Sequence, residues 1–373
     1  MTRQSDISSS MQTPADAVDT MTGVDTTDID TRQTDSAQIE HEIQGHRLNA
    51  AKSSRVYDWI LTGGIIFVAL GLLLAPLGLQ TYGLVVLSTW AVRAIAVHGL
   101  NLTLGYAGQV SLAQAAFMGV GAYTTTLLVL EGGINFWLAM LCGMLVSGGI
   151  GFLIGFPALR IREGHYLAFV TLGFGNLIWL FFRNEAWLTN GPLGIRDIPR
   201  PSIFGLSLFA PVRFYYFSLV MLLLVTLVVW YIVRSPWGRA FRALRDNSAR
   251  SESLGLSKTT YTLMAFAIGS AIAGVAGAMQ AVLVEFIDPD SFGLVRSLLL
   301  ILMLVVGGRG NLAGPFFGAA MVTILPEALR FTQEYYLILF ATGVILVMLY
   351  FPQGIAGIFP YLRKRFFMER IAS

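Results

Sequence analysis

Apolar stretches recur along this chain from about residue 59 to residue 352, separated by polar connections. A helix needs roughly 20 residues, at about 1.5 Å each, to cross a hydrocarbon core of about 30 Å. Nine stretches approach or exceed this length: 59–79, 84–104, 112–130, 136–158, 165–183, 214–233, 261–284, 314–330 and 335–352. A tenth, 297–307, is too short to span upright and ends at Gly307-Gly308, which indicates a shortened or broken helix. The pattern predicts an all-α, polytopic membrane helix bundle of about ten transmembrane segments.

The two ends of the chain differ from this apolar region. Residues 1–50 are rich in Thr, Ser and Asp, and they lack aromatic side chains and any apolar run. Such a segment buries too little apolar surface to offset the entropy of ordering, so we predict a disordered acidic tail and not a signal peptide. Residues 57–358 form the predicted membrane domain, and residues 359–373 form a basic C-terminal segment.

One connection, residues 234–260, is longer and more regular than a turn requires: RSPWGRAFRALRDNSARSESLGLSKTT. Ser235 and Pro236 predict a helix start, because a hydroxyl caps free N–H groups and a proline ring presets the first turn. Three apolar residues then share one face at i, i+4 and i+7, and three arginines line the opposite side: Trp237, Phe241, Leu244 and Arg239, Arg242, Arg245. A short two-faced helix between two membrane segments indicates a surface that another protein binds.

Composition supports a membrane protein and excludes several chemistries. The chain is 55% hydrophobic and 13% charged, whereas soluble domains carry about 25% charged residues. The single cysteine, Cys142, excludes a disulfide framework, and the four histidines lack metal-ligand spacing. The three lysines do not follow glycines in a phosphate-loop pattern, so ATP binding of that kind is excluded. We expect a non-enzyme with no catalytic residue, metal or cofactor, and no nucleic-acid partner.

Lysine and arginine between the apolar segments set the predicted orientation, because basic residues stay on the cytoplasmic side. Most of them fall on the side that holds residues 47–55, the connection 234–260 and the C-terminal segment. Fewer fall on the other side: Arg183, Arg196, Arg200, Arg213, Arg296 and Arg330. An even number of crossings then places both termini and the 234–260 connection in the cytoplasm.

A polar, glycine-interrupted stretch between Leu100 and Tyr123 is the candidate translocation path. Its residues are Asn101, Gly105, Gly108, Gln109, Ser111 and Gln114. Glycines let helices approach closely, and a helix break turns backbone dipoles toward a cavity; a plain packing interface is the alternative. Arg93 joins the candidate path, because it lies mid-span, with His98 five residues on, at a depth where charge is costly. It either contacts a substrate carboxylate or a gating acid, or it pairs with a distant segment to hold helices together.

Four motifs in order resemble one known family. They are LNLTLGYAGQVSLAQAAFMGVGAY, the run 165–200, the connection GRAFRALRDNSARSESLG and the stretch VVGGRGNLAGPFFGAA. Over roughly residues 85–357 the chain resembles the LivM-type permease of ABC importers for branched-chain amino acids. The resemblance implies that 57–358 is a permease domain of the bacterial inner membrane, moving branched-chain or related amino acids into the cytoplasm. The implied partners are a second LivH-like permease, two cytoplasmic ABC ATPases that hydrolyse ATP, a periplasmic or extracellular substrate-binding protein, and membrane lipid.

The resemblance also assigns roles to two connections. Residues 238–255 match the family's ATPase-contact segment, although its strict E-A-A-x-x-x-G form is absent. There the arginines would face the ATPase, and the apolar residues would seat the helix on the membrane segments. The acids would pair with basic residues of either partner. Alternatively, the arginines only fix the topology. The implied coupling residues are Trp237, Gly238, Arg239, Phe241, Arg242, Leu244, Arg245, Asp246, Glu252 and Gly255. In the outer connection, LTNGPLGI resembles a family element, and a plain structured loop is its alternative role. The implied binding-protein docking residues are Asn190, Gly191, Pro192, Gly194, Arg196 and Arg200.

Three other functions stay open at this point. A urea or amide ABC permease has the same architecture, although LTNGPLGIRDIPRP is more similar to the amino-acid branch. A stand-alone secondary transporter would carry intramembrane acids or a proton relay, which the predicted spans nearly lack. A purely structural membrane scaffold would not need the two-faced connection.

Overall fold

The computed structural model describes residues 70–160, 166–203, 206–330, 335–351 and 353–357, which belong to one compact unit. The predicted tail at 1–50, the C-terminal segment at 359–373 and most of the first predicted membrane segment lie outside the described residues. Residues 70–78 of that first segment are helical.

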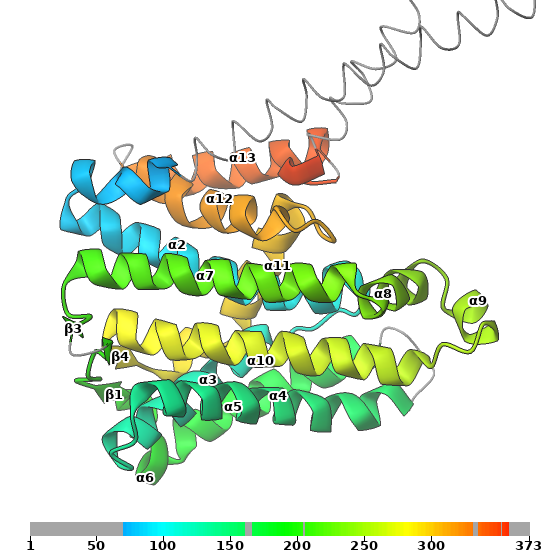
Figure 1. Ribbon diagram of the computed structural model, residues 1–373, viewed down its shortest axis with the longest axis horizontal. Helices are drawn as coiled ribbons and strands as arrows, with labels where there is room; N and C mark the ends of the chain where they lie inside the picture. The colour runs from blue at the N-terminus through cyan, green and yellow to red at the C-terminus, as the bar shows by residue number, and fades with distance from the viewer. Residues whose placement is uncertain (1–69, 161–165, 204–205, 331–334, 352, 358–373) are drawn as a thin grey trace, which may run out of the picture. The chain divides into compact units, whose positions relative to one another are not determined.

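Long helices make up most of this unit (Figure 1). They are α2 (Thr81–Leu100), which continues as the π-helix η1 (Asn101–Tyr106), α3 (Gln114–Leu130), α4 (Phe136–Arg160), α5 (Tyr166–Asn184), α7 (Pro211–Arg234), α10 (Lys258–Val284), α11 (Leu294–Gly307), α12 (Gly314–Ala328) and α13 (Tyr336–Tyr350). Each coincides with a predicted apolar segment. Within the described part of the chain, seven helices are long and apolar enough to cross a membrane. The predicted all-α membrane bundle is therefore confirmed.

Short elements connect the long helices. The helical ones are α6 (Ala186–Thr189), η2 (Gly191–Leu193), α8 (Pro236–Asp246), α9 (Ser248–Ser253), η3 (Pro289–Phe292) and η5 (Ile355–Gly357). Strand β1 (Ile195–Arg196) pairs antiparallel with β4 (Phe286–Ile287), and β2 (Ser202–Ile203) pairs with β3 (Leu206–Ser207). Helices α8 and α9 lie at one end of the bundle, and α6 and the strands lie at the other (Figure 1).

The tenth predicted segment is a broken helix, as the sequence indicated. Helix α11 begins at Leu294 and is preceded by η3, with Gly293 extended between them. Pro289 starts η3, and its ring presets the first turn. Together Pro289–Gly307 is long enough to cross a membrane.

Close packing of small residues builds the centre of the bundle. Helices α2 and α10 are the most buried of the spans, and α10 packs against α2, α3 and α4. A Cβ atom at Gly121 would overlap the backbone of Gly274, and one at Gly277 would overlap the carbonyl of Met118. The backbones of α3 and α10 therefore approach to a separation that only glycine permits.

After η1 the chain runs back into the bundle without helical structure, so α3 begins late and is shorter than the neighbouring helices α2 and α4. Gln114 begins α3 and donates from Nε2 to Ala96 O at 3.1 Å. Ala96 precedes the end of η1 by ten residues, or about 15 Å of helix. Helix α3 therefore starts part-way down the bundle and not at its end. The break predicted from Gly105 and Gly108 is confirmed, since residues 107–113 are not helical.

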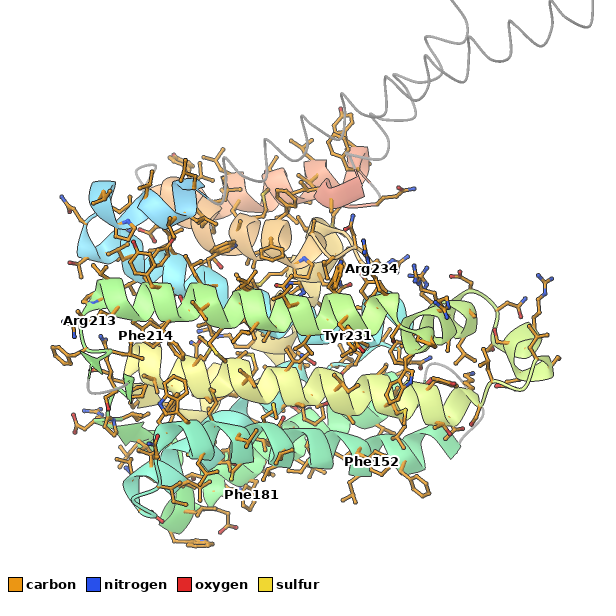
Figure 2. The ribbon with its side chains drawn as sticks, viewed as in Figure 1. Phe152, Phe181, Arg213, Phe214, Tyr231 and Arg234 are labelled. Atoms are coloured by element: carbon orange, nitrogen blue, oxygen red, sulfur yellow. The ribbon has the colours of Figure 1, made fainter. Side chains whose placement is uncertain are left out.

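The outer surface has the composition that lipid requires. Phe152, Phe181 and Tyr231 are exposed on α4, α5 and α7 (Figure 2). Arg213 and Arg234 mark the two ends of α7, which has 24 residues and is thus about 36 Å long. That length is enough to cross the hydrocarbon core of a membrane.

Candidate functional site

Helix α8 begins as the sequence predicted. Ser235 is the N-cap, and its Oγ accepts from the Trp237 amide at 3.2 Å. Pro236 occupies the first turn, where its missing N–H costs nothing. The cap and the proline fix the start of α8 directly after α7 ends, so α8 lies across the end of the bundle.

A buried face holds α8 against the membrane helices. Phe241 and Leu244 are buried, and Phe241 packs with Leu102 and Tyr106 of η1. Gly238 is also buried, and a Cβ atom there would overlap the Val233 backbone. The predicted seating is therefore found for these two large side chains.

Trp237 corrects the sequence prediction. It was expected to seat α8 together with Phe241 and Leu244, but it is 43% exposed. Trp237 lies in the first turn of α8, next to the cap. The small residues Gly238 and Ala240 occupy the contact in its place.

The three arginines of α8 differ in what they contact. Arg239 is exposed. Arg242 donates from Nε to Gly238 O and from Nη2 to Val233 O, both at 3.2 Å, and it remains exposed. Both side chains are available at the surface, as the prediction requires.

Arg245 is exposed like the other two arginines, and it also contacts the membrane helices. Its Nη1 donates to Gly105 O at 2.6 Å, and its Nε pairs with Asp246 at 3.1 Å. Its aliphatic part leaves no room for a side chain at Gly108, so it lies directly on the turn after η1. The long side chain reaches around the edge of α8, and Arg245 thereby joins α8 to the π-helix.

The remaining predicted coupling residues follow α8. Asp246 is exposed apart from its pairing with Arg245, and Glu252 is exposed on α9. Asn247 caps α9, because its Oδ1 accepts from Arg250 N at 3.0 Å. Gly255 has φ +86° and ends this short helix, a conformation that glycine adopts readily.

Asn101 and Gly105 form a junction between η1 and the loop after α11. Asn101 donates from Nδ2 to Asn311 O at 2.9 Å and accepts from Gly310 N at 2.8 Å. A Cβ atom at Gly105 would overlap Asn101 Oδ1 and lie 2.5 Å from Gly310 N. Asn101 is completely buried, so it holds two segments together and does not line an open path within this chain.

The other predicted path residues divide into two groups. Gln114 is buried and bonded to the backbones of α2 and α10, at Ala96 O and Gly269 O. Ser111 is buried, and its hydroxyl has no hydrogen-bond partner among the described residues. In contrast, Gly108 is exposed and Gln109 is half-buried. Of these four residues, only Gly108 and Gln109 are accessible at the surface of the chain.

Arg93 contacts a distant segment, which is one of the two roles that the sequence left open. Its Nη1 donates to Thr323 Oγ1 of α12 at 3.1 Å. His98 is completely buried, and its Nε2 lies 3.2 Å from Thr226 Oγ1 of α7. Thus Arg93 and His98 face different neighbouring helices.

The outer connection is a rigid turn at the end opposite α8. Asn190 has φ +60°, and its Nδ2 donates to Gly194 O at 2.8 Å. A Cβ atom at Gly194 would overlap Ile287 O, so the turn lies tightly against β4. Gly191 and Pro192 form η2 between them.

The two arginines predicted to dock a binding protein behave differently. Arg196 is exposed, with its guanidinium 5.6 Å from the Phe286 ring. Arg200 is a correction, because it pairs with Glu285 and donates to Phe209 O at 2.6 Å. The positive charge of Arg200 is therefore neutralised by Glu285 and is not available to a binding protein. A pocket of about 710 Å³ opens beside the turn, lined by Trp187, Leu193, Asn190, Arg196 and residues from the end of α3.

Sequence reasoning missed the partners of these residues. Gly310 and Asn311 belong to the glycine-rich stretch GGRGN, which was named only as part of a family motif. Thr323 accepts a hydrogen bond from Arg93. A single threonine in an apolar helix does not indicate such a contact in the sequence. The glycine spacing in GGRGN was the one indication that a backbone would approach another segment there.

The comparison with protein families decides the classification. A family model described as "Branched-chain amino acid transport system / permease component" matches residues 81–349. The chain belongs to this family. The matched region of this chain runs from the start of α2 into α13. Helix α8, η1 and the outer turn therefore all lie within the permease region. The predicted resemblance to LivM-type permeases is confirmed.

Individual relatives agree with the family assignment. The chain is 37% identical over 280 residues to the high-affinity branched-chain amino acid transport system permease protein LivM of Salmonella typhimurium, and 34% identical to LivM of Escherichia coli. Each match covers 69% of this chain and 66% of the relative, slightly less than two thirds. The permease protein BraD of Pseudomonas aeruginosa is 27% identical over 74% of the chain and 94% of its own length. No solved structure gave a significant match.

Proposed function

We propose that this family member is the transmembrane permease subunit of an ABC importer that moves branched-chain amino acids into the cytoplasm. The carrying observation is α8, a capped helix seated on the bundle by Phe241 and Leu244 with Arg239 and Arg242 exposed. A lone transporter has no use for such a surface. The relatives' stated substrate, branched-chain amino acids, supports the choice of cargo.

ATP hydrolysis then belongs to separate subunits that bind α8. Exposed arginines, Arg239 and Arg242 among them, and the exposed carboxylate of Glu252 offer charges to a partner at this end of the bundle. No group of three or more metal-ligating side chains occurs within the described part of the chain. We propose that the chain acts by moving its helices and supplies no catalytic residue.

A contact chain leads from α8 into the membrane helices. Arg245 joins α8 to Gly105 of η1, and Asn101 of η1 holds Gly310 and Asn311 of the next loop. Asn311 in turn donates to Ala356 O at 3.4 Å. A displacement of α8 by an ATPase would reach α2, α11 and the end of the described chain through these bonds.

The orientation and the other partners follow from the same assignment. The α8 end faces the cytoplasm, and residues 353–357 lie at this end through the contact with Asn311. The opposite end, with Arg196 and the pocket beside it, receives the substrate-binding protein. A second, LivH-like permease completes the membrane part. The rigid outer turn suits docking, because it orders no further residues when the binding protein arrives.

Reversing one exposed charge tests the ATPase surface. Arg239→Glu is expected to weaken co-purification of the ATPase subunits with the permease complex at least about tenfold, because a charge is reversed within the contact. Arg196→Glu is the matched control, since it reverses an exposed arginine at the opposite end and should leave ATPase recovery unchanged. Equal recovery with both variants would contradict the assignment of α8.

A further inference from the structure

Two arginines lie at the depth of the membrane interior. Arg93 is near the middle of the 26-residue span Thr81–Tyr106. Arg296 lies in the first turn of α11, eleven residues before Gly307, or about 16 Å along the helix. The charge pattern of the sequence had placed Arg296 in an outer connection. The short α11, beginning part-way across, brings it inward.

No described carboxylate neutralises this pair. Arg93 donates to the Thr323 hydroxyl of α12, and α11, which carries Arg296, packs against both α2 and α12. Neither arginine forms an ion pair within the described residues. The carboxylates that precede α11 are already engaged: Asp288 by Ser291 and Asp290 by Trp179. A hydroxyl orients a guanidinium but leaves its charge uncompensated.

The surface that exposes these two arginines is unfavourable for contact with lipid. Arg93 is half-buried, whereas every other residue from Trp90 to Tyr106 is buried. Arg296 is exposed, and so are its neighbours Val295 and Leu298. Two charges facing hydrocarbon at this depth would be costly, and charges of this kind face a bundle interior or a water-filled cavity. Arg93 and Arg296 therefore require water or a charged partner on this face.

We propose that Arg93 and Arg296 bind the carboxylate of the amino acid as it crosses the membrane, with Thr323 positioning Arg93. This inference rests on the proposed function and assigns it a binding site. Guanidinium groups bind carboxylates through paired, charge-assisted hydrogen bonds. The capping residue Gly293 has no side chain, so the first amides of α11 add positive potential. Val295 and Leu298 offer the apolar surface that a branched side chain requires.

Leucine uptake by the reconstituted importer, with both permeases, both ATPases and the binding protein, tests this site. The variants are Arg93→Gln, Arg296→Gln and Arg93→Lys, with Arg330→Gln as the matched control because Arg330 is exposed at the outer end. Each glutamine variant is expected to lower the maximal rate of leucine uptake at least about tenfold, the usual effect of losing a hydrogen bond to a charged group. Arg93→Lys should retain part of the rate. ATP hydrolysis stimulated by the binding protein, and recovery of the second permease, should stay unchanged.

The other outcomes separate this site from the proposed function. If the wild-type complex takes up no leucine, the proposed function fails and the inference falls with it. If the wild type transports and both glutamine variants match it, the carboxylate site alone is wrong. If the variants lose the second permease from the complex, the arginines bind a carboxylate of that subunit, and the substrate site is overturned. Arg296 is exposed, so Arg296→Gln decides the matter even where Arg93→Gln does not fold.

Discussion

Replacing Arg245 with alanine is expected to lower ATP-driven uptake at least about tenfold while ATPase binding and ATP hydrolysis persist. The hydrogen bond from its Nη1 to Gly105 O, at 2.6 Å, joins α8 to the π-helix. A hydrogen bond from a charged donor contributes about 1.5–3 kcal/mol, or roughly 10–100-fold in an equilibrium. Without it, α8 would move with the ATPase but carry η1 along less effectively. The measurement is leucine uptake and ATP hydrolysis by the same reconstituted complex.

Two variants control this prediction. Arg250→Ala removes an exposed arginine of the neighbouring helix α9, and uptake should be unchanged. Gly108→Ala should resemble Arg245→Ala in part, because a Cβ atom there would collide with the Arg245 side chain. Loss of ATPase binding by Arg245→Ala would show instead that Arg245 contacts the ATPase directly. Normal uptake by Arg245→Ala would refute the link between α8 and η1.

Gly277→Leu is expected to prevent formation of a stable bundle. A side chain at Gly277 would overlap the Met118 carbonyl, which belongs to the backbone of α3 and is fixed by its helix. Forcing α3 and α10 apart would also disturb the contact between Gly121 and Gly274. Such overpacking costs about 1–3 kcal/mol and more where backbone is involved, which is a large fraction of the stability of a folded protein.

The matched control for this change is Gly149→Leu. Gly149 lies inside helix α4, but its Cβ position has no neighbouring atom within 4 Å. Both variants place leucine in a membrane helix, so they differ in packing and not in composition. The measurement is the yield of monodisperse protein in detergent and its thermal unfolding temperature. Equal stability of the two variants would contradict the close contact of α3 and α10.

The sequence predicted the helices well, because their apolar lengths are set by membrane thickness. It also predicted α8 from local chemistry, since a cap, a proline and two faces need no distant partner. The bond between Arg245 and η1 was not predicted, because it needs a distant partner. A helical repeat places the Cβ atom on one side, but a long side chain can reach around the helix to a carbonyl contributed by a segment 140 residues earlier.

The candidate path was the least predictable feature for the same reason. Asn101 and Gln114 have polar side chains of the kind that line a path. However, their amide groups are hydrogen-bonded to backbone carbonyls that are distant in the sequence. Only the fold decides whether such a group faces a cavity or a neighbouring helix. Similarly, Arg200 is paired with Glu285, which approaches it only because β1 and β4 pair.

Uptake by a fully defined system tests the central claim most directly. Proteoliposomes would hold this chain, the second permease and the two ATPases, with the binding protein and radiolabelled leucine outside and ATP inside. The account predicts leucine accumulation that requires ATP, the ATPases and the binding protein, and no ATP hydrolysis by this chain alone. Leucine uptake by this chain alone, driven by an ion gradient, would contradict it.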